Sequence, residues 1–135
     1  MHPTLPAAAP AARCLELYAS AQAAHAELRR PLTWNGAQAL CRRLGVPVLM
    51  RPMPVPAQVV GALGTSVVLL DSNTPPRRHT YLLAHELAHV LLGHTGGREG
   101  VVYHLTPCAP DDPREDDAEL LATLMLQGPR FARHF

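Results

Sequence analysis

The sequence of 135 residues contains no lysine, so arginine supplies all twelve of its basic side chains. With eleven acidic residues the formal net charge is only +1, and no basic field argues for direct binding to nucleic acid. No apolar run approaches the length needed to span a membrane, and the first residues lack the apolar segment of a signal peptide. We therefore expect a protein that binds neither nucleic acid nor membranes.

Cysteine and aromatic residues are also scarce. Cys14, Cys41 and Cys108 are odd in number and widely spaced, so they fit neither a disulfide framework nor a C-x-x-C metal site. This usage indicates a reducing compartment, and the expected location is the cytoplasm.

The length is near the commonest domain size. We expect a flexible Pro/Ala-rich arm over residues 1–10, followed by a single domain over residues 11–135; nothing in the sequence indicates an oligomeric state.

Hydrophobic periodicity and turn residues predict an α+β fold, with helices packed on one side of a small, roughly three-stranded sheet. Thr33 can cap a helix that Gly45 ends, and Pro113 suits the start of the last one. The expected helices cover residues 11–29, 34–44, 76–93 and 113–127, and the expected strands cover residues 46–50, 58–63 and 66–71.

One predicted helix carries a motif with chemical meaning. Residues 80–94 read TYLLAHELAHVLLGH and contain an H-E-x-x-H core formed by His85, Glu86 and His89. Residues four apart lie on one face of a helix, so both imidazoles can reach a single ion. Glu86 is adjacent to the first histidine and could take a proton from a zinc-activated water. The spacing is typical of zinc-dependent hydrolases.

The same helix is apolar nearly all round, which predicts that it is buried. Leu83, Leu87, Val90 and Leu91 fall at i, i+4, i+7 and i+8. Two histidines and a glutamate in such a helix need partners that offset their desolvation. A metal ion is one such partner; the alternative is a pair of core histidines hydrogen-bonded to the backbone.

A catalytic zinc site needs a third protein ligand. Six of the eleven acidic residues cluster around the start of the last predicted helix. The helix register favours Glu115 over Asp116 and Glu119, because Glu115 shares a face with the small residues Ala118 and Ala122. Glu119, one turn further on, is expected to accept the free N–H of a ligand histidine. The alternative for Glu115 is a first-turn acid that stabilises the helix without a metal.

Three other residues lie near this predicted site. Tyr103 and His104 fall in a short strand or extended lip over residues 101–105, where either side chain could assist catalysis. The alternative is that Tyr103 packs its ring and His104 is exposed. His94 lies five residues beyond His89, off the ligand face, and is expected to be a helix-end residue rather than a ligand.

Three segments, in the right order, resemble the ImmA/IrrE family of small metallopeptidases. Residues 75–94 resemble its (F/Y)-x-L-A-H-E-L-x-H-x-L-L active-site helix, and residues 44–48, LGVPV, resemble its L-G-V-x-V junction between helix and strand. Residues 115–125, EDDAELLATLM, resemble its E-x-E-A-N-x-F-A-x-x-L-L-M-P helix. The similarity spans about residues 33–126.

This resemblance implies a zincin-like core, a minimal gluzincin, with a zinc ion as cofactor. It implies that His85 and His89 bind zinc, that Glu86 is the catalytic base and that Glu115 is the third ligand. Glu119 stands where the family usually has Asn. Relatives are linked to cleavage of helix-turn-helix repressors in mobile elements and stress responses. The expected partner is therefore a protein substrate of that class.

A rival hypothesis of a different class is a non-catalytic zinc-containing module that binds a repressor or toxin. The two hypotheses differ at Glu86, because a structural zinc site has no use for a general base. The presence of Glu86 favours the enzyme.

Overall fold

The computed structural model describes residues 8–62, 65–94, 103–104 and 113–132. Cys108 lies outside the described residues, while Cys14 and Cys41 are buried free thiols. Among the residues described, no helix is long and apolar enough to cross a membrane. The helical elements are α1 (Ala8–Ala24), η1 (Ala26–Leu28), α2 (Trp34–Leu44), η2 (Pro76–Arg78), α3 (His79–Leu91), α4 (Pro113–Gln127) and α5 (Pro129–Ala132).

The first helix differs in its bounds from the helix expected over residues 11–29. It begins at Ala8, inside the stretch expected to be an arm. Pro10 is tolerated in the first turn, because an N–H there would have no helical partner. The helix ends at Ala24, since His25 adopts an extended backbone with φ −132°, and a short 3-10 helix follows. The predicted division into arm and domain stays a prediction.

Helix α2 shows how local sequence sets the ends of an element. The side chain of Thr33 accepts a hydrogen bond from the N–H of Gly36 at 3.0 Å, as an N-cap does. Gly45 takes the left-handed conformation with φ 70° at the other end. Both boundaries predicted from Thr33 and Gly45 are confirmed.

The sheet consists of β1 (Val48–Arg51), β2 (Ala57–Ala62), β3 (Thr65–Asp71) and the two-residue β4 (Tyr103–His104), in the order β1-β3-β2-β4. Strand β1 is parallel to β3, while β2 is antiparallel to both β3 and β4. The three longer strands are the three predicted ones. The α+β prediction is confirmed.

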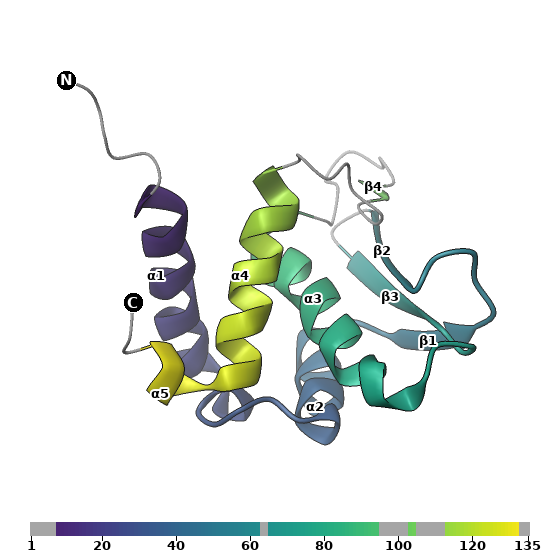
Figure 1. Cartoon of the computed structure of the whole chain (residues 1–135), viewed down its shortest axis with the longest axis horizontal. Coiled ribbons are helices and arrows are strands. Elements are labelled where there is room, and N and C mark those ends of the chain that lie inside the picture. The colour runs from purple at the N-terminus through teal and green to yellow at the C-terminus, as the bar shows by residue number, and fades with distance from the viewer. Residues whose placement is uncertain (1–7, 63–64, 95–102, 105–112, 133–135) are drawn as a thin grey trace.

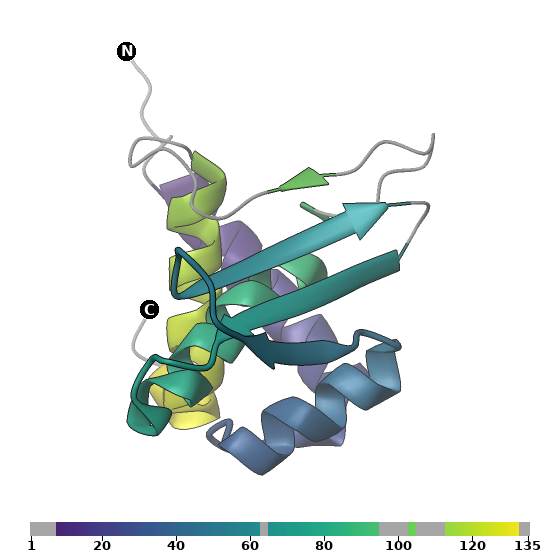
Figure 2. The same cartoon turned by 90° about the vertical axis from the view of Figure 1, so that its right-hand side faces the viewer.

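One face of this sheet carries the core. Along β2 and β3, Ala57, Val59, Val68 and Leu70 are buried, and the residues between them are half-buried, as the period of two requires. Figure 2 shows the sheet in front of helices α1, α3 and α4. The sheet therefore buries one face against helices.

Helix α3 lies at the centre of the molecule. It contacts the sheet through β2 and β3 on one side and α4 on the other, and α4 in turn contacts α1 (Figure 1). Every residue from Leu82 to His89 is buried, as the nearly all-round apolar pattern predicted. Both helices carry small side chains that are fully buried: Ala84 and Ala88 on α3, and Ala118 and Ala122 on α4. The two helices can therefore approach closely.

Candidate metal centre

The two histidines of the H-E-x-x-H core lie one turn apart on α3. His85 and His89 are both buried, and their ring centroids are 5.0 Å apart. The helix thus places two imidazoles on the face that meets α4. This is the arrangement that the spacing predicted.

Helix α4 brings a carboxylate to the same point. Oε2 of Glu115 lies 2.7 Å from Nε2 of His85, and Oε1 of Glu115 lies 3.3 Å from Nε2 of His89. One ligand atom from each of these three residues can be chosen so that all lie within 4.8 Å of one another. The three residues form a group that could hold a metal ion.

The polar atoms of this group fit a metal better than they fit one another. Nε2 of His85, Nε2 of His89 and Oε1 of Glu115 are buried, and although they converge at 2.7–3.3 Å from the opposing groups, none makes a hydrogen bond of good geometry among the described residues. Buried polar atoms without partners are costly and rare. Two imidazole nitrogens and a carboxylate oxygen match the ligand chemistry and number of a catalytic zinc site. We conclude that the residues present fit a bound zinc ion.

The other ring nitrogen of His85 is held by Glu119. Oε1 of Glu119 lies 3.1 Å from Nδ1 of His85 and also accepts a hydrogen bond of 2.6 Å from the hydroxyl of Tyr81. A carboxylate can only accept here, so Nδ1 of His85 carries a hydrogen, and in a neutral imidazole Nε2 then keeps its lone pair for a metal. This is the contact that the register of α4 predicted for Glu119.

The other ring nitrogen of His89 faces a third histidine. Nδ1 of His89 lies 2.9 Å from Nδ1 of His94, and the two ring centroids are 5.1 Å apart. His94 is a helix-end residue, as expected, but its side chain also reaches a histidine of the metal-binding group.

Burial changes the acid–base properties of the site. The pKa of His89 is lowered to about 4, chiefly by burial and further by the neighbouring rings of His85 and His94, against an opposing effect of Glu115. Neutral His89 is the form that can bind a metal. The pKa of Tyr81 is raised, first by burial and then by its hydrogen bond to Glu119. Tyr81 therefore stays a hydrogen-bond donor at neutral pH.

The remaining predicted residues take distinct positions. Glu86 has only 1% of its surface exposed, so it is a buried carboxylate next to His85 on α3. Asp116 is exposed, and Asp117 forms an ion pair of 3.0 Å with Arg13 of α1. Among the acids that the structure describes at the start of α4, only Glu115 belongs to the group with the two histidines.

Tyr103 and His104 form strand β4, whose backbone pairs with Val60 and Gly61 of β2. This places a short strand in the segment predicted as a strand or lip. The positions of the two side chains lie outside the described part of the chain. Their catalytic role stays a prediction.

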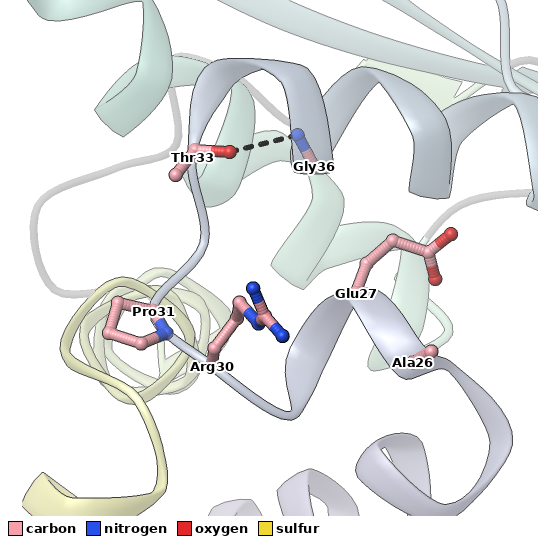
Figure 3. A pocket seen from close by; sticks show the side chains of 6 residues that line it. All are labelled: Ala26, Glu27, Arg30, Pro31, Thr33 and Gly36. Carbon is pink, nitrogen blue, oxygen red and sulfur yellow. Dashed lines mark hydrogen bonds between the residues drawn. The ribbon is translucent and has the colours of Figure 1, made fainter.

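A cavity of about 330 Å³ lies elsewhere, between η1 and the start of α2 (Figure 3). It is lined by Ala26, Glu27, Arg30, Pro31, Thr33 and Gly36. Two of its polar side chains are already engaged, because Thr33 caps α2 and Glu27 pairs with Arg43 at 2.8 Å. This cavity contains no member of the His-His-Glu group.

Comparison with known families agrees with the geometry. The sequence model of peptidase family M78, described as the IrrE N-terminal-like domain, matches residues 41–133. The chain belongs to peptidase family M78. No curated protein sequence matches it. The resemblance noted from the three sequence segments is thus confirmed at the level of the family.

The M78 match runs from the last turn of α2 to α5 and includes every residue of the candidate metal centre. Membership suggests a metallopeptidase, and the His-His-Glu group, which could hold a metal ion, is consistent with it. Sequence reasoning missed two contacts in this M78 domain, those of Tyr81 and His94. Tyr81 lies four residues before His85 and so shares its helical face, which was the available signal.

Proposed function

We propose that this M78 domain is a zinc-dependent peptidase in which His85, His89 and Glu115 hold the metal and Glu86 is the general base. The observation that carries the proposal is the convergence of three buried ligand atoms, two from α3 and one from α4, that make no hydrogen bond of good geometry among the described residues. Three protein ligands are the number found in catalytic zinc sites, which keep one position open for water or substrate.

Zinc, when bound, supplies Lewis acidity, which makes a water more acidic and polarises a peptide carbonyl. The residues of the chain orient the groups that would hold the metal. Glu119 and its neighbour Tyr81 hold His85 with Nε2 turned toward Glu115. The contact between α3 and α4 fixes how far Glu115 lies from both histidines.

Glu86 is the residue proposed for proton transfer. It follows His85 directly on α3, and its side chain is 1% exposed. A carboxylate at this position can accept the proton of the attacking water and then deliver it to the amine that leaves when the peptide bond breaks. Burial makes this role more effective, because fixed charges interact more strongly where water is excluded.

We further propose a protein substrate of the helix-turn-helix repressor class, acted on in the cytoplasm. What supports this is the resemblance to ImmA/IrrE relatives over the three sequence segments. The competing possibility, a non-catalytic zinc module that binds such a partner, has no need of a buried glutamate beside its ligands.

The test compares the native protein with Glu86→Gln. Each is incubated, with and without a chelator, with a peptide library and a panel of helix-turn-helix repressors, and the products are identified by mass spectrometry. Cleavage by the native protein should stop with chelator. It should fall by at least about 10²- to 10⁴-fold in Glu86→Gln, since the amide cannot accept a proton.

Glu16→Gln is the matched control, because Glu16 is exposed on α1, and it should cleave normally. Glu86→Gln should keep its zinc and its melting temperature. Full activity in Glu86→Gln would rule out Glu86 as the base, whereas bound zinc without cleavage by any variant would favour the non-catalytic module.

A further inference from the structure

The end of helix α3 is built so that His94 returns to His89. The N–H of Gly93 donates to the carbonyl of Val90 at 3.0 Å, and the N–H of His94 donates to the carbonyl of His89 at 2.9 Å. These two bonds define a Schellman motif, with Gly93 in the left-handed conformation at φ 77°. The motif brings the sixth residue of the turn beside the first, which here are His94 and His89.

A Schellman motif is usually completed by a contact between apolar side chains at these two positions. In this chain both positions are histidines, and their Nδ1 atoms are 2.9 Å apart. At this distance one nitrogen must donate and the other must accept. The orientation of His89 decides which nitrogen donates and which accepts.

Nε2 of His89 faces Oε1 of Glu115 at 3.3 Å in the candidate metal centre. A histidine binds a metal through a nitrogen that carries no hydrogen, so the hydrogen of His89 must lie on Nδ1. His94 must then accept with Nδ1 and carry its own hydrogen on Nε2. We propose that His94 is a positioning residue that fixes the tautomer and ring orientation of His89 for metal binding. This inference rests on the proposed function.

The two histidine ligands are therefore held by unlike partners. A carboxylate, Glu119, accepts from Nδ1 of His85 across the interface with α4. A neutral imidazole, His94, accepts from Nδ1 of His89 within the turn that ends α3. A partner that only stabilised the helix end would not need to be a hydrogen-bond acceptor. That difference makes the proposal testable.

Two substitutions of similar size separate the roles. In His94→Asn, the side-chain oxygen can stand in for Nδ1 as the acceptor. In His94→Leu the side chain can still make the apolar contact that favours a Schellman motif, but it accepts nothing. Both variants should fold, as thermal melts would verify, and only the first should preserve the tautomer of His89.

The experiment has two readouts. Long-range ¹H–¹⁵N spectra of the metal-free proteins near neutral pH report which nitrogen of His89 carries hydrogen, and calorimetric titration reports zinc affinity. We expect the Nδ1–H form in the native protein and in His94→Asn, with zinc affinities within a few-fold of each other. We expect a mixture of tautomers in His94→Leu, with zinc bound about 10- to 100-fold more weakly.

An unchanged tautomer together with unchanged zinc affinity in His94→Leu would overturn the proposal. So would an Nε2–H form in the native metal-free protein. A native protein with the Nδ1–H tautomer but no zinc affinity would instead refute the proposed function while leaving the hydrogen-bond assignment intact. The failures of the two proposals are thus distinguishable.

Discussion

The hydroxyl of Tyr81 lies 2.6 Å from Oε1 of Glu119, joining helix α3 to helix α4 one turn away from the candidate metal centre. The same oxygen faces Nδ1 of His85 at 3.1 Å. Glu119 has a long side chain that is about half exposed, so a single contact would leave it several conformers. Two donors on one oxygen restrict the carboxylate to the position that orients His85.

Replacing Tyr81 by Phe should therefore weaken zinc binding without unfolding the protein. We expect a loss of affinity smaller than that of Glu119→Ala, at most about 10-fold, because the carboxylate remains but is less restrained. Calorimetric zinc titration measures the effect. The matched control is Tyr18→Phe, which removes a hydroxyl that donates to the carbonyl of Leu28 and should leave zinc affinity unchanged. Equal effects of the two substitutions would contradict the role given to Tyr81.

The third ligand can be tested within α4 itself. Glu115→Ala should bind zinc very poorly, because two nitrogens are left to hold the ion. Glu119→Ala should lose only about 10- to 100-fold, as hydrogen-bond partners of ligands do. Asp116→Ala, which changes an exposed neighbour, should titrate like the native protein. If Glu119→Ala lost zinc outright and Glu115→Ala kept it, the assignment of the two glutamates would have to be exchanged.

The left-handed conformation of Gly93 is expected to matter for the metal as well as for the helix. A β-branched residue disfavours this conformation, so Gly93→Val should destabilise the fold by about 1–2 kcal/mol and displace His94 from His89. Gly45→Val is the control, since Gly45 has a similar φ of 70° and, like Gly93, no atom within 4 Å of an added Cβ. Urea unfolding should show similar losses of stability in both variants, while zinc titration should show weaker binding only in Gly93→Val. Normal zinc binding in both variants would argue against the positioning role proposed for His94.

Acid should destabilise the metal-free protein through His89. Its pKa is about 4 in the folded state, below the ordinary 6.5, so the unfolded chain binds the extra proton between these values. The stability contributed by neutral His89 is fully present above pH 6.5 and is lost as pH falls toward 4. The slope is at most about 1.4 kcal/mol per pH unit.

The comparison is with His89→Gln, whose side chain does not titrate. Urea unfolding across this pH range should give a difference in unfolding free energy, native minus variant, that falls as the solution is acidified. A difference independent of pH would show that His89 is not held neutral by its surroundings.

Much of the site could be predicted because it depends on helical periodicity. The spacing of His85 and His89 and the register of Glu115 and Glu119 are properties of single helices. The small residues Ala118 and Ala122 further indicated which face of α4 approaches α3. The periodic patterns of two helices, taken together, were sufficient to predict the His-His-Glu group.

Other features depend on contacts that no local pattern encodes. The hydrogen bond between Tyr81 and Glu119 requires the actual crossing of α3 and α4, and the order β1-β3-β2-β4 requires long-range strand pairing. The side chain of His94 is an intermediate case. A glycine four residues and a histidine five residues after His89 are a recognisable Schellman signal, but helical geometry alone places His94 away from the ligand face.

The central claim is that His85, His89 and Glu115 form a zinc site, and equilibrium zinc titration of the metal-free protein tests it most directly. The native protein should bind about one zinc per chain. Binding should be lost in His85→Ala and in His89→Ala, and kept in His25→Ala, whose histidine lies in the turn after α1. Absence of zinc binding by the native protein, or undiminished binding by His85→Ala and His89→Ala, would contradict the claim.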